Sequence, residues 1–203
     1  MSRTAGPAPG AVRGGQRRVR RRDCGAGLLP EDALAAELAV DHLHRLGHRR
    51  IGMASGPSGN RPAGRGVRGF VAALARWGAD DGEAWVVRQS YTVEGGQAAA
   101  ASLVAQGATA IVAASDYMAL GAIRGVRRQG HSVPVDVSVV GYDGTSITEF
   151  TDPALTTVRQ PADRLVKVSC SVLALESNRE VPAGELLFDP GLVIRASTGA
   201  PRG

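Results

Sequence analysis

The sequence of 203 residues predicts an α/β protein built on a mainly parallel β-sheet. Two observations predict this fold class. Short runs of apolar and β-branched residues alternate with amphipathic segments of about 10–15 residues, which is the pattern of consecutive β-α-β units. Glycine is abundant, with 27 residues, and a glycine follows most of the amphipathic segments, where helices typically end. The chain is long enough to bury a hydrophobic core.

The first helix is expected to begin at Pro30 and to end at Gly47. Two acidic residues follow Pro30, and a proline followed by acids is typical of the first turn of a helix. An apolar stripe along this helix is formed by Leu34, Leu38, Leu43 and Leu46. The stripe indicates a helix that packs one face on the core.

Further strands and helices alternate along the rest of the chain. The predicted strands are 51–54, 85–87, 109–114, 137–142, 156–158, 186–188 and 192–195. The predicted helices are centred on 67–74 or cover 95–106, 116–129 and 162–176. Ser115 stands at the N-cap of the helix 116–129, and Gly78, Gly107 and Gly130 each stand where a helix ends.

Residues 1–29 differ in composition from everything that follows. Residues 1–30 carry seven arginines and a single acid, Asp23, and are rich in glycine, proline and alanine. Because this segment has no hydrophobic period, we expect residues 1–29 to be disordered. Its run GGQRRVRRR suits at most weak, sequence-blind contact with phosphates of DNA, and a solvated tail is the alternative. The tail has no apolar region of a secretory signal, and no run in the chain is long enough for a membrane helix.

Two strand ends carry polar residues that suit ligand binding. In open parallel sheets, ligands bind beyond the carboxyl ends of the strands. Ser115 follows the strand 109–114, and Asp143 follows the strand 137–142, where its carboxylate can accept hydrogen bonds from ligand hydroxyl or N–H groups. The alternative is that Ser115 only caps a helix and Asp143 only forms a turn.

Four motifs in series resemble one family. The segments HLHRLGHRRIG, SDYMALGAIRGVRRQG, VPVDVSVVGYDG and FTDPALTTVRQP resemble the effector-binding core of LacI/GalR-type bacterial transcription regulators, and LLFDPGLVIRASTG resembles its last strands. The resemblance extends from Glu31 to Pro201. It implies an α/β, parallel-sheet, periplasmic-binding-protein-like fold in residues 30–201.

The resemblance implies two subdomains, of which the first is incomplete. Residues 30–90 are expected to form a partial N-terminal subdomain together with the returning C-terminal strands, and residues 91–190 the C-terminal subdomain. The helix-turn-helix headpiece and the first β-α-β units of the family are not found in residues 1–30. We therefore expect the strand Ile51–Ala54 to expose an apolar edge, and the monomer to be marginally stable.

The resemblance also implies roles for individual residues. Asp143 is expected to hydrogen-bond the effector, and Ser115 stands where the family usually has an effector-contacting Asn. Tyr91 stands where the family often places an aromatic that stacks on the ligand, and its alternative role is to anchor a strand end. The usual arginine position is occupied by Gly66, so Arg65 is the expected replacement. The dimer surface is expected around Leu120 and Phe150.

The sequence thus predicts a ligand-responsive transcription regulator that binds a small, sugar-like effector and lacks its own helix-turn-helix. The alternatives are a sugar-binding protein of a transport system and a non-functional regulator fragment. We expect a cytoplasmic homodimer, or a mixed dimer with a full-length relative. DNA contact then depends on the missing headpiece, or weakly on the arginine-rich tail, and no membrane partner is expected.

Enzyme chemistry is not indicated by the sequence. We find no candidate nucleophile beside a base and no phosphate-binding loop motif. His42 and His44 are two residues apart on a helix and do not share a face, and Asp41 with His44 would supply only two metal ligands. We therefore expect no catalytic residue, no metal and no cofactor.

Overall fold

The computed structural model describes residues 19–22, 27–30, 32–79, 81–160 and 185–202. Nine strands are present in this part of the chain: β1 (Val19–Arg22), β2 (Gly27–Pro30), β3 (Ile51–Ser55), β4 (Val86–Arg88), β5 (Ala110–Ala113), β6 (Ser138–Asp143), β7 (Thr156–Arg159), β8 (Glu185–Phe188) and β9 (Gly191–Val193). The α-helices of the same part are α1 (Asp32–Arg45), α2 (Arg61–Arg76), α3 (Val93–Ala105) and α4 (Asp116–Arg128). The predicted helix 162–176 lies outside the described residues.

A six-stranded sheet forms the centre of the molecule, with strand order β4-β3-β5-β6-β7-β9. The first five strands are parallel, and β9 runs antiparallel to β7. The prediction of a mainly parallel α/β sheet is thereby confirmed. We expected a subdomain boundary near residue 90. β3 and β4 precede this residue and β5, β6, β7 and β9 follow it, yet all six strands belong to the same sheet.

The expectation that the strand Ile51–Ala54 exposes an apolar edge is wrong. β3 pairs with β4 on one side and with β5 on the other, and all five of its residues are buried. The sequence pattern predicted the strand 85–87 correctly, but the pattern does not encode which strand lies beside which. β4 covers the edge that was expected to be open.

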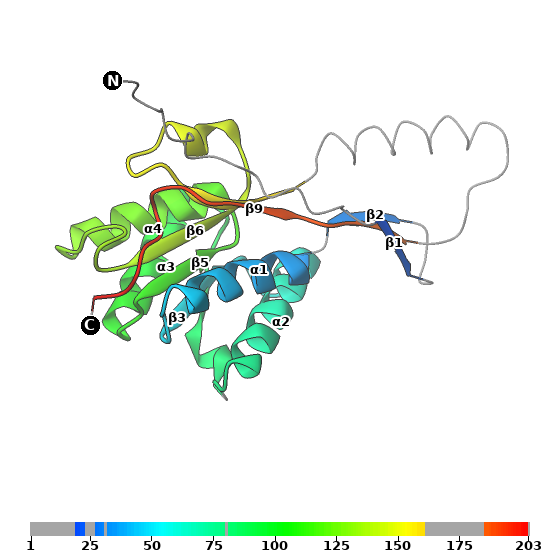
Figure 1. The fold of residues 1–203 in the computed structure, drawn as a ribbon, viewed down its shortest axis with the longest axis horizontal. Coiled ribbons are helices and arrows are strands. Elements are labelled where there is room, and N and C mark those ends of the chain that lie inside the picture. The colour runs from blue at the N-terminus through cyan, green and yellow to red at the C-terminus, as the bar shows by residue number, and fades with distance from the viewer. Residues whose placement is uncertain (1–18, 23–26, 31, 80, 161–184, 203) are drawn as a thin grey trace, which may run out of the picture.

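Helices cover both faces of the sheet, and the helix pairs lie on opposite sides of the strands (Figure 1). Neighbouring residues of β5 alternate between the two layers: Ile111 packs with α3 and α4, whereas Val112 packs with α1 and α2. Because both faces are buried, the central strand β5 is apolar throughout and β3 nearly so, rather than alternating. Gly96 and Gly121 bring α3 and α4 into backbone contact, since a Cβ at either position would overlap the other helix.

A second, three-stranded sheet has the order β1-β8-β2. β8 runs antiparallel to β1 and parallel to β2. Residues 1–29 were expected to be disordered, whereas 19–22 and 27–30 lie in these strands. Strand pairing uses backbone N–H and C=O groups and therefore needs no hydrophobic period, and the partner strand comes from the far end of the chain.

Candidate effector-binding site

A pocket of about 410 Å³ opens at the carboxyl ends of the parallel strands. Its volume falls in the range of about 300–1,000 Å³ that is usual for small-molecule sites. It is lined by Asp32, Asn60, Pro62, Tyr91, Ala114, Ser115, Tyr117, Tyr142, Asp143 and Gln160. The structure thus brings together Tyr91, Ser115 and Asp143, three of the four residues that the sequence predicted for the effector site.

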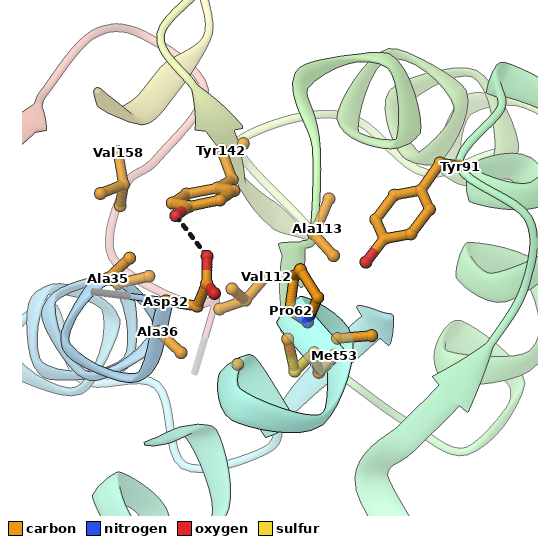
Figure 2. Close-up of a pocket in the computed structure, with 15 residues that line it drawn as sticks. Asp32, Ala35, Ala36, Met53, Pro62, Tyr91, Val112, Ala113, Tyr142 and Val158 are labelled. Carbon is orange, nitrogen blue, oxygen red and sulfur yellow. Dashed lines mark hydrogen bonds between the residues drawn. The ribbon is translucent and has the colours of Figure 1, made fainter. Parts of the chain in front are cut away.

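An apolar recess of about 50 Å³ adjoins this pocket. The two cavities share Asp32, Pro62, Tyr91, Ala114 and Tyr142, so the recess is continuous with the polar pocket. Small and apolar side chains from α1, α2 and the strands form the rest of its wall, as Figure 2 shows. A ligand in this position meets polar groups on one side and apolar groups on the other.

Asp143 ends β6 in an unusual backbone conformation. Its φ of 113° lies in the left-handed region, where residues other than glycine are uncommon. Its Oδ1 accepts a hydrogen bond of 2.8 Å from Gln160 Nε2. Burial, followed by the nearby charge of Asp116, raises the pKa of Asp143 to about 6. At neutral pH the carboxylate is therefore mainly ionised and suited to accept hydrogen bonds.

Ser115 is the N-cap of α4, as the sequence predicted. Its Oγ accepts a hydrogen bond of 3.2 Å from the backbone N–H of Met118. A serine hydroxyl that accepts at the oxygen can still donate its own proton. The capping role and a donor role toward a ligand are therefore compatible.

Tyr91 lies in the connection between β4 and α3 and is 37% exposed. Its ring packs directly on Gly56, where any Cβ would overlap the ring atoms. Burial and the charges of Asp32 and Asp143 raise the pKa of Tyr91, so the phenol stays protonated at neutral pH. Figure 2 shows Tyr91 across the cavity from Tyr142, with Ala113 between them.

Arg65 lines neither cavity. Its Nε and one terminal nitrogen contact Asp32 Oδ2 at 2.9 and 2.7 Å. Asp32 is only 6% exposed, and its Oδ1 accepts a hydrogen bond of 2.8 Å from the Tyr142 hydroxyl (Figure 2). Arg65 thus reaches the site through Asp32, a residue that the sequence indicated only as an acid in the first turn of a helix.

The residues expected at a dimer surface lie on the outside of the molecule. Phe150 is 82% exposed, and Leu120 on α4 is partly exposed. A surface groove beside Leu120 is lined also by Ile123, Arg124, Arg127, Arg128, Thr151 and Asp152. The exposed phenylalanine and this groove are compatible with the predicted surface, which stays a prediction.

The described residues contain neither a candidate metal cluster nor a membrane-spanning helix. No group of three or more His, Cys, Asp or Glu side chains in this part of the chain could hold a metal ion. None of the helices in the described ranges is long and apolar enough to cross a membrane.

Comparisons with known proteins agree with the motifs. Residues 40–198 match the family model of the periplasmic binding protein-like domain. The chain is 46% identical to the HTH-type transcriptional regulator MalR of Streptomyces coelicolor, over 87% of this chain and 53% of that protein. It is 36% identical to the HTH-type transcriptional repressor CytR of Escherichia coli, over 84% of this chain and 51% of the repressor. The chain spans about half the length of the curated relatives it matches.

Solved structures show the same likeness. A dimeric Lac repressor with an 11-residue C-terminal deletion has a TM-score of 0.82 and 29% identity, covering 88% of this chain and 65% of that one. The transcriptional regulator CelR in complex with cellobiose has a TM-score of 0.80 and 29% identity, covering 86% and 54%. The resemblance to LacI-type regulators is confirmed, and because the relatives are regulators, the expectation of a non-enzyme is confirmed with it.

Proposed function

Because the chain belongs to the periplasmic binding protein-like domain family and covers the effector-binding core of LacI-type regulators, we propose that it senses a small effector for transcription regulation. The observation that carries this proposal is the convergence of Tyr91, Ser115 and Asp143 on one pocket at the carboxyl ends of the sheet.

The chemistry of the pocket favours a sugar-like effector. The Asp143 carboxylate can accept hydrogen bonds from two neighbouring hydroxyls, and Ser115 can donate one. The exposed ring of Tyr91 offers a flat apolar face to the C–H surface of a sugar ring. The adjoining recess takes an apolar edge of the same ligand, while Asp32 and Tyr142 border the connection between the two cavities.

Regulation requires partners beyond the effector. We propose that the chain forms a homodimer, or a mixed dimer with a longer relative, through the surface around Leu120 and Phe150. DNA recognition then belongs to a helix-turn-helix headpiece carried by the assembly, with residues 1–29 adding at most weak phosphate contact. A regulator that acts on DNA in this way works in the cytoplasm. Effector binding biases the assembly between two states with different affinities for DNA.

Thermal unfolding followed by Trp77 and Trp85 fluorescence tests the binding step. Glucose, maltose, cellobiose and cytidine serve as probes for a monosaccharide, two disaccharides and a nucleoside. A ligand that binds only the folded state stabilises it by about 2.7 kcal/mol at a concentration of 100 times its Kd. We expect one sugar to raise the melting temperature of the wild type.

Two variants show where that probe binds. Asp143→Asn removes the proposed acceptor charge and should abolish the shift. Asp81→Asn makes the same chemical change at an exposed position away from the pocket and should leave the shift intact. Equal shifts in the wild type and Asp143→Asn would place the ligand elsewhere, and no shift with any probe would contradict the proposal.

A further inference from the structure

Asp116 is a fully buried carboxylate immediately behind the proposed effector site. It is the first residue of α4, it follows Ser115 directly, and it is 0% exposed. It belongs to the lining of neither cavity at the carboxyl ends of the strands. Asp116 therefore cannot contact an effector in the pocket, and any effect on binding has to pass through other residues.

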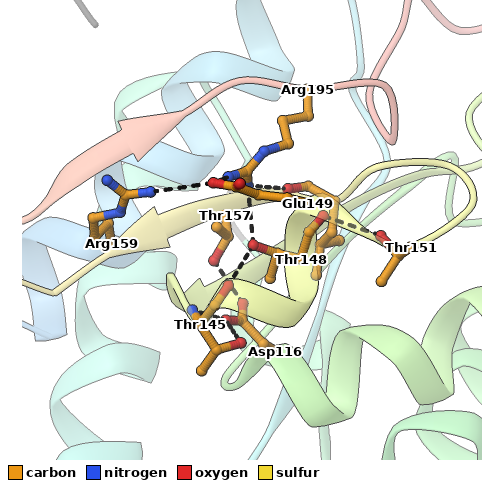
Figure 3. A network of polar contacts seen from close by, with 9 residues as sticks. Asp116, Thr145, Thr148, Glu149, Thr151, Thr157, Arg159 and Arg195 are labelled. Carbon is orange, nitrogen blue, oxygen red and sulfur yellow. Dashed lines mark hydrogen bonds and ion pairs between the residues drawn. The ribbon is translucent and has the colours of Figure 1, made fainter. Parts of the chain in front are cut away.

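Three hydrogen bonds hold this carboxylate. Its Oδ2 accepts from the backbone N–H of Thr145 at 2.7 Å and from the Thr145 hydroxyl at 2.8 Å. Its Oδ1 accepts from the Thr157 hydroxyl at 2.6 Å. Figure 3 shows the side chains of Thr145 and Thr157 directed toward Asp116. Gly141 of β6 leaves the room for this carboxylate, because a Cβ there would contact Asp116 Oδ1.

These bonds fix the turn that presents Asp143. The chain leaves β6 with φ angles of 113° at Asp143 and 73° at Gly144, and Thr145 follows. Such a conformation at a non-glycine residue persists only where surrounding contacts enforce it. Two bonds from Thr145 to Asp116 enforce it from one side.

The same contacts continue into the loop after the turn. The Thr148 hydroxyl donates to the Thr145 carbonyl at 2.6 Å, and Arg195 donates to Thr148 Oγ1 at 3.1 Å (Figure 3). Arg195 also pairs with Glu149 at 2.8 Å. The turn is thus bonded directly to Asp116, and the loop that follows it is bonded to Arg195.

We propose that Asp116 is a positioning residue for the effector site: its buried carboxylate fixes the turn of residues 143–145 and thereby holds the Asp143 carboxylate against the pocket. This inference rests on the proposed function of Asp143. A solely structural acid at the start of α4 would stabilise the helix without any influence on the backbone conformation of Asp143.

Nuclear magnetic resonance of the free full-length chain tests the positioning without any ligand. Aspartate labelled with ¹³C reports the titration of the Asp143 carboxyl group, and its Cα shift with the HN–Hα coupling reports its φ angle. In Asp116→Asn we expect the pKa of Asp143 to fall from about 6 toward its ordinary value, and the left-handed signature to be lost. Other charged or titratable groups near Asp143, namely Asp32, Tyr91, Tyr142 and its strand partner Arg159, are unchanged in this variant.

A second pair of variants covers the case in which Asp116→Asn does not fold. Thr157→Val removes one hydrogen bond to Asp116 but keeps the charge, whereas Thr157→Ser keeps the hydroxyl. We expect the left-handed signature of Asp143 to weaken in Thr157→Val and to be restored in Thr157→Ser.

Ligand binding provides the last readout. For the probe that stabilises the wild type, we expect about a tenfold loss of affinity in Asp116→Asn, since hydrogen bonds to charged groups have this order of effect. An unchanged φ of Asp143 in the folded variants would overturn the inference. If no probe binds the wild type, the proposed function fails, and the φ of Asp143 in the free protein still decides the role of Asp116.

Discussion

The two ends of the parallel sheet differ in how completely their polar groups are paired. At the amino ends, His48 is 1% exposed and contacts the Thr109 hydroxyl at 3.0 Å, the Ser138 hydroxyl at 3.0 Å and the Gly199 carbonyl at 2.9 Å. A neutral ring that donates from Nε2 and accepts at Nδ1 satisfies both nitrogens. This end is closed by the C-terminal segment.

The carboxyl ends of the strands open to the pocket and carry strained or unpaired polar groups. Asp143 has a left-handed backbone, a raised pKa and a carboxylate near that of Asp116. Ser55 ends β3, and its buried hydroxyl has no hydrogen-bond partner among the described residues. Strained or unpaired groups beside a pocket are typical of binding sites, whereas complete pairing is typical of structural regions. This contrast supports the proposal that the amino ends stabilise the fold and that the carboxyl ends bind the ligand.

The largest effect is expected at the closed end. His48→Ala removes the centre of a buried polar cluster and leaves a cavity, so it should lower the free energy of unfolding by about 3 kcal/mol. Urea unfolding measures this loss. The exposed His131→Ala is the matched control and should change stability by less than about 0.5 kcal/mol. Similar small losses in both variants would mean that the amino ends do not hold the fold together.

At the carboxyl ends, removal of a charge should raise the free energy of unfolding rather than lower it. Asp143 is less stable ionised in the folded than in the unfolded chain, because its pKa rises from 3.8 to about 6. Asp143→Asn should therefore stabilise the ligand-free protein at pH 7 by about 1–3 kcal/mol. Asp81→Asn, measured alongside by urea unfolding, should be neutral. A destabilised Asp143→Asn would show that this carboxylate supports the fold.

Acidification should change the contributions of the two ends to the free energy of unfolding in opposite directions. Burial lowers the pKa of His48 and His42, so the unfolded chain binds more protons and stability falls as the pH drops below about 6.5. The raised pKa of Asp143 acts oppositely: its stabilising contribution is full below about pH 4 and is lost as the pH rises through about 6. Between pH 7 and pH 5, urea unfolding should show a steeper loss of stability in Asp143→Asn than in the wild type. Parallel profiles would contradict the raised pKa of Asp143.

The smallest effect is expected at Gly56, where the ring of Tyr91 rests. Gly56→Ala should push the ring aside and weaken binding of the stabilising sugar about fivefold, the order of one aromatic contact. Because Tyr91 is partly exposed and can move, stability should change little. Gly64→Ala, where a Cβ would make only an ordinary contact with the Arg68 side chain, is the control for calorimetric titration. Equal affinities in the two variants would argue against a ligand contact by Tyr91.

The sequence could predict the parallel sheet and the place of Ser115 and Asp143 at its carboxyl ends, because local patterns determine both. Ser115 and Asp143 each follow a strand directly, and parallel strand ends meet at one edge. Asp32 could not be predicted in the same way. Its partner Tyr142 lies 110 residues further along the chain, and only the packing of α1 on the sheet brings the two together.

The errors have the same origin. Pairing between distant segments decides which strand lies beside β3 and which one pairs with β1. No local sequence pattern encodes these pairings. Asp116 was likewise predicted only as the start of a helix, since its contact with Thr157 depends on how β7 lies beside β6.

The central claim is that ligand binds at the carboxyl ends of the sheet and not at the amino ends. Its most direct test is a ¹H–¹⁵N correlation spectrum of the full-length chain titrated with cellobiose, and in parallel with glucose, maltose and cytidine. We expect one probe to move the amide signals of Tyr91, Ser115 and Asp143 at the carboxyl ends, while those of Ser138 and Gly199 at the amino ends stay in place. Movement confined to the amino ends, or no movement with any probe, would contradict the account.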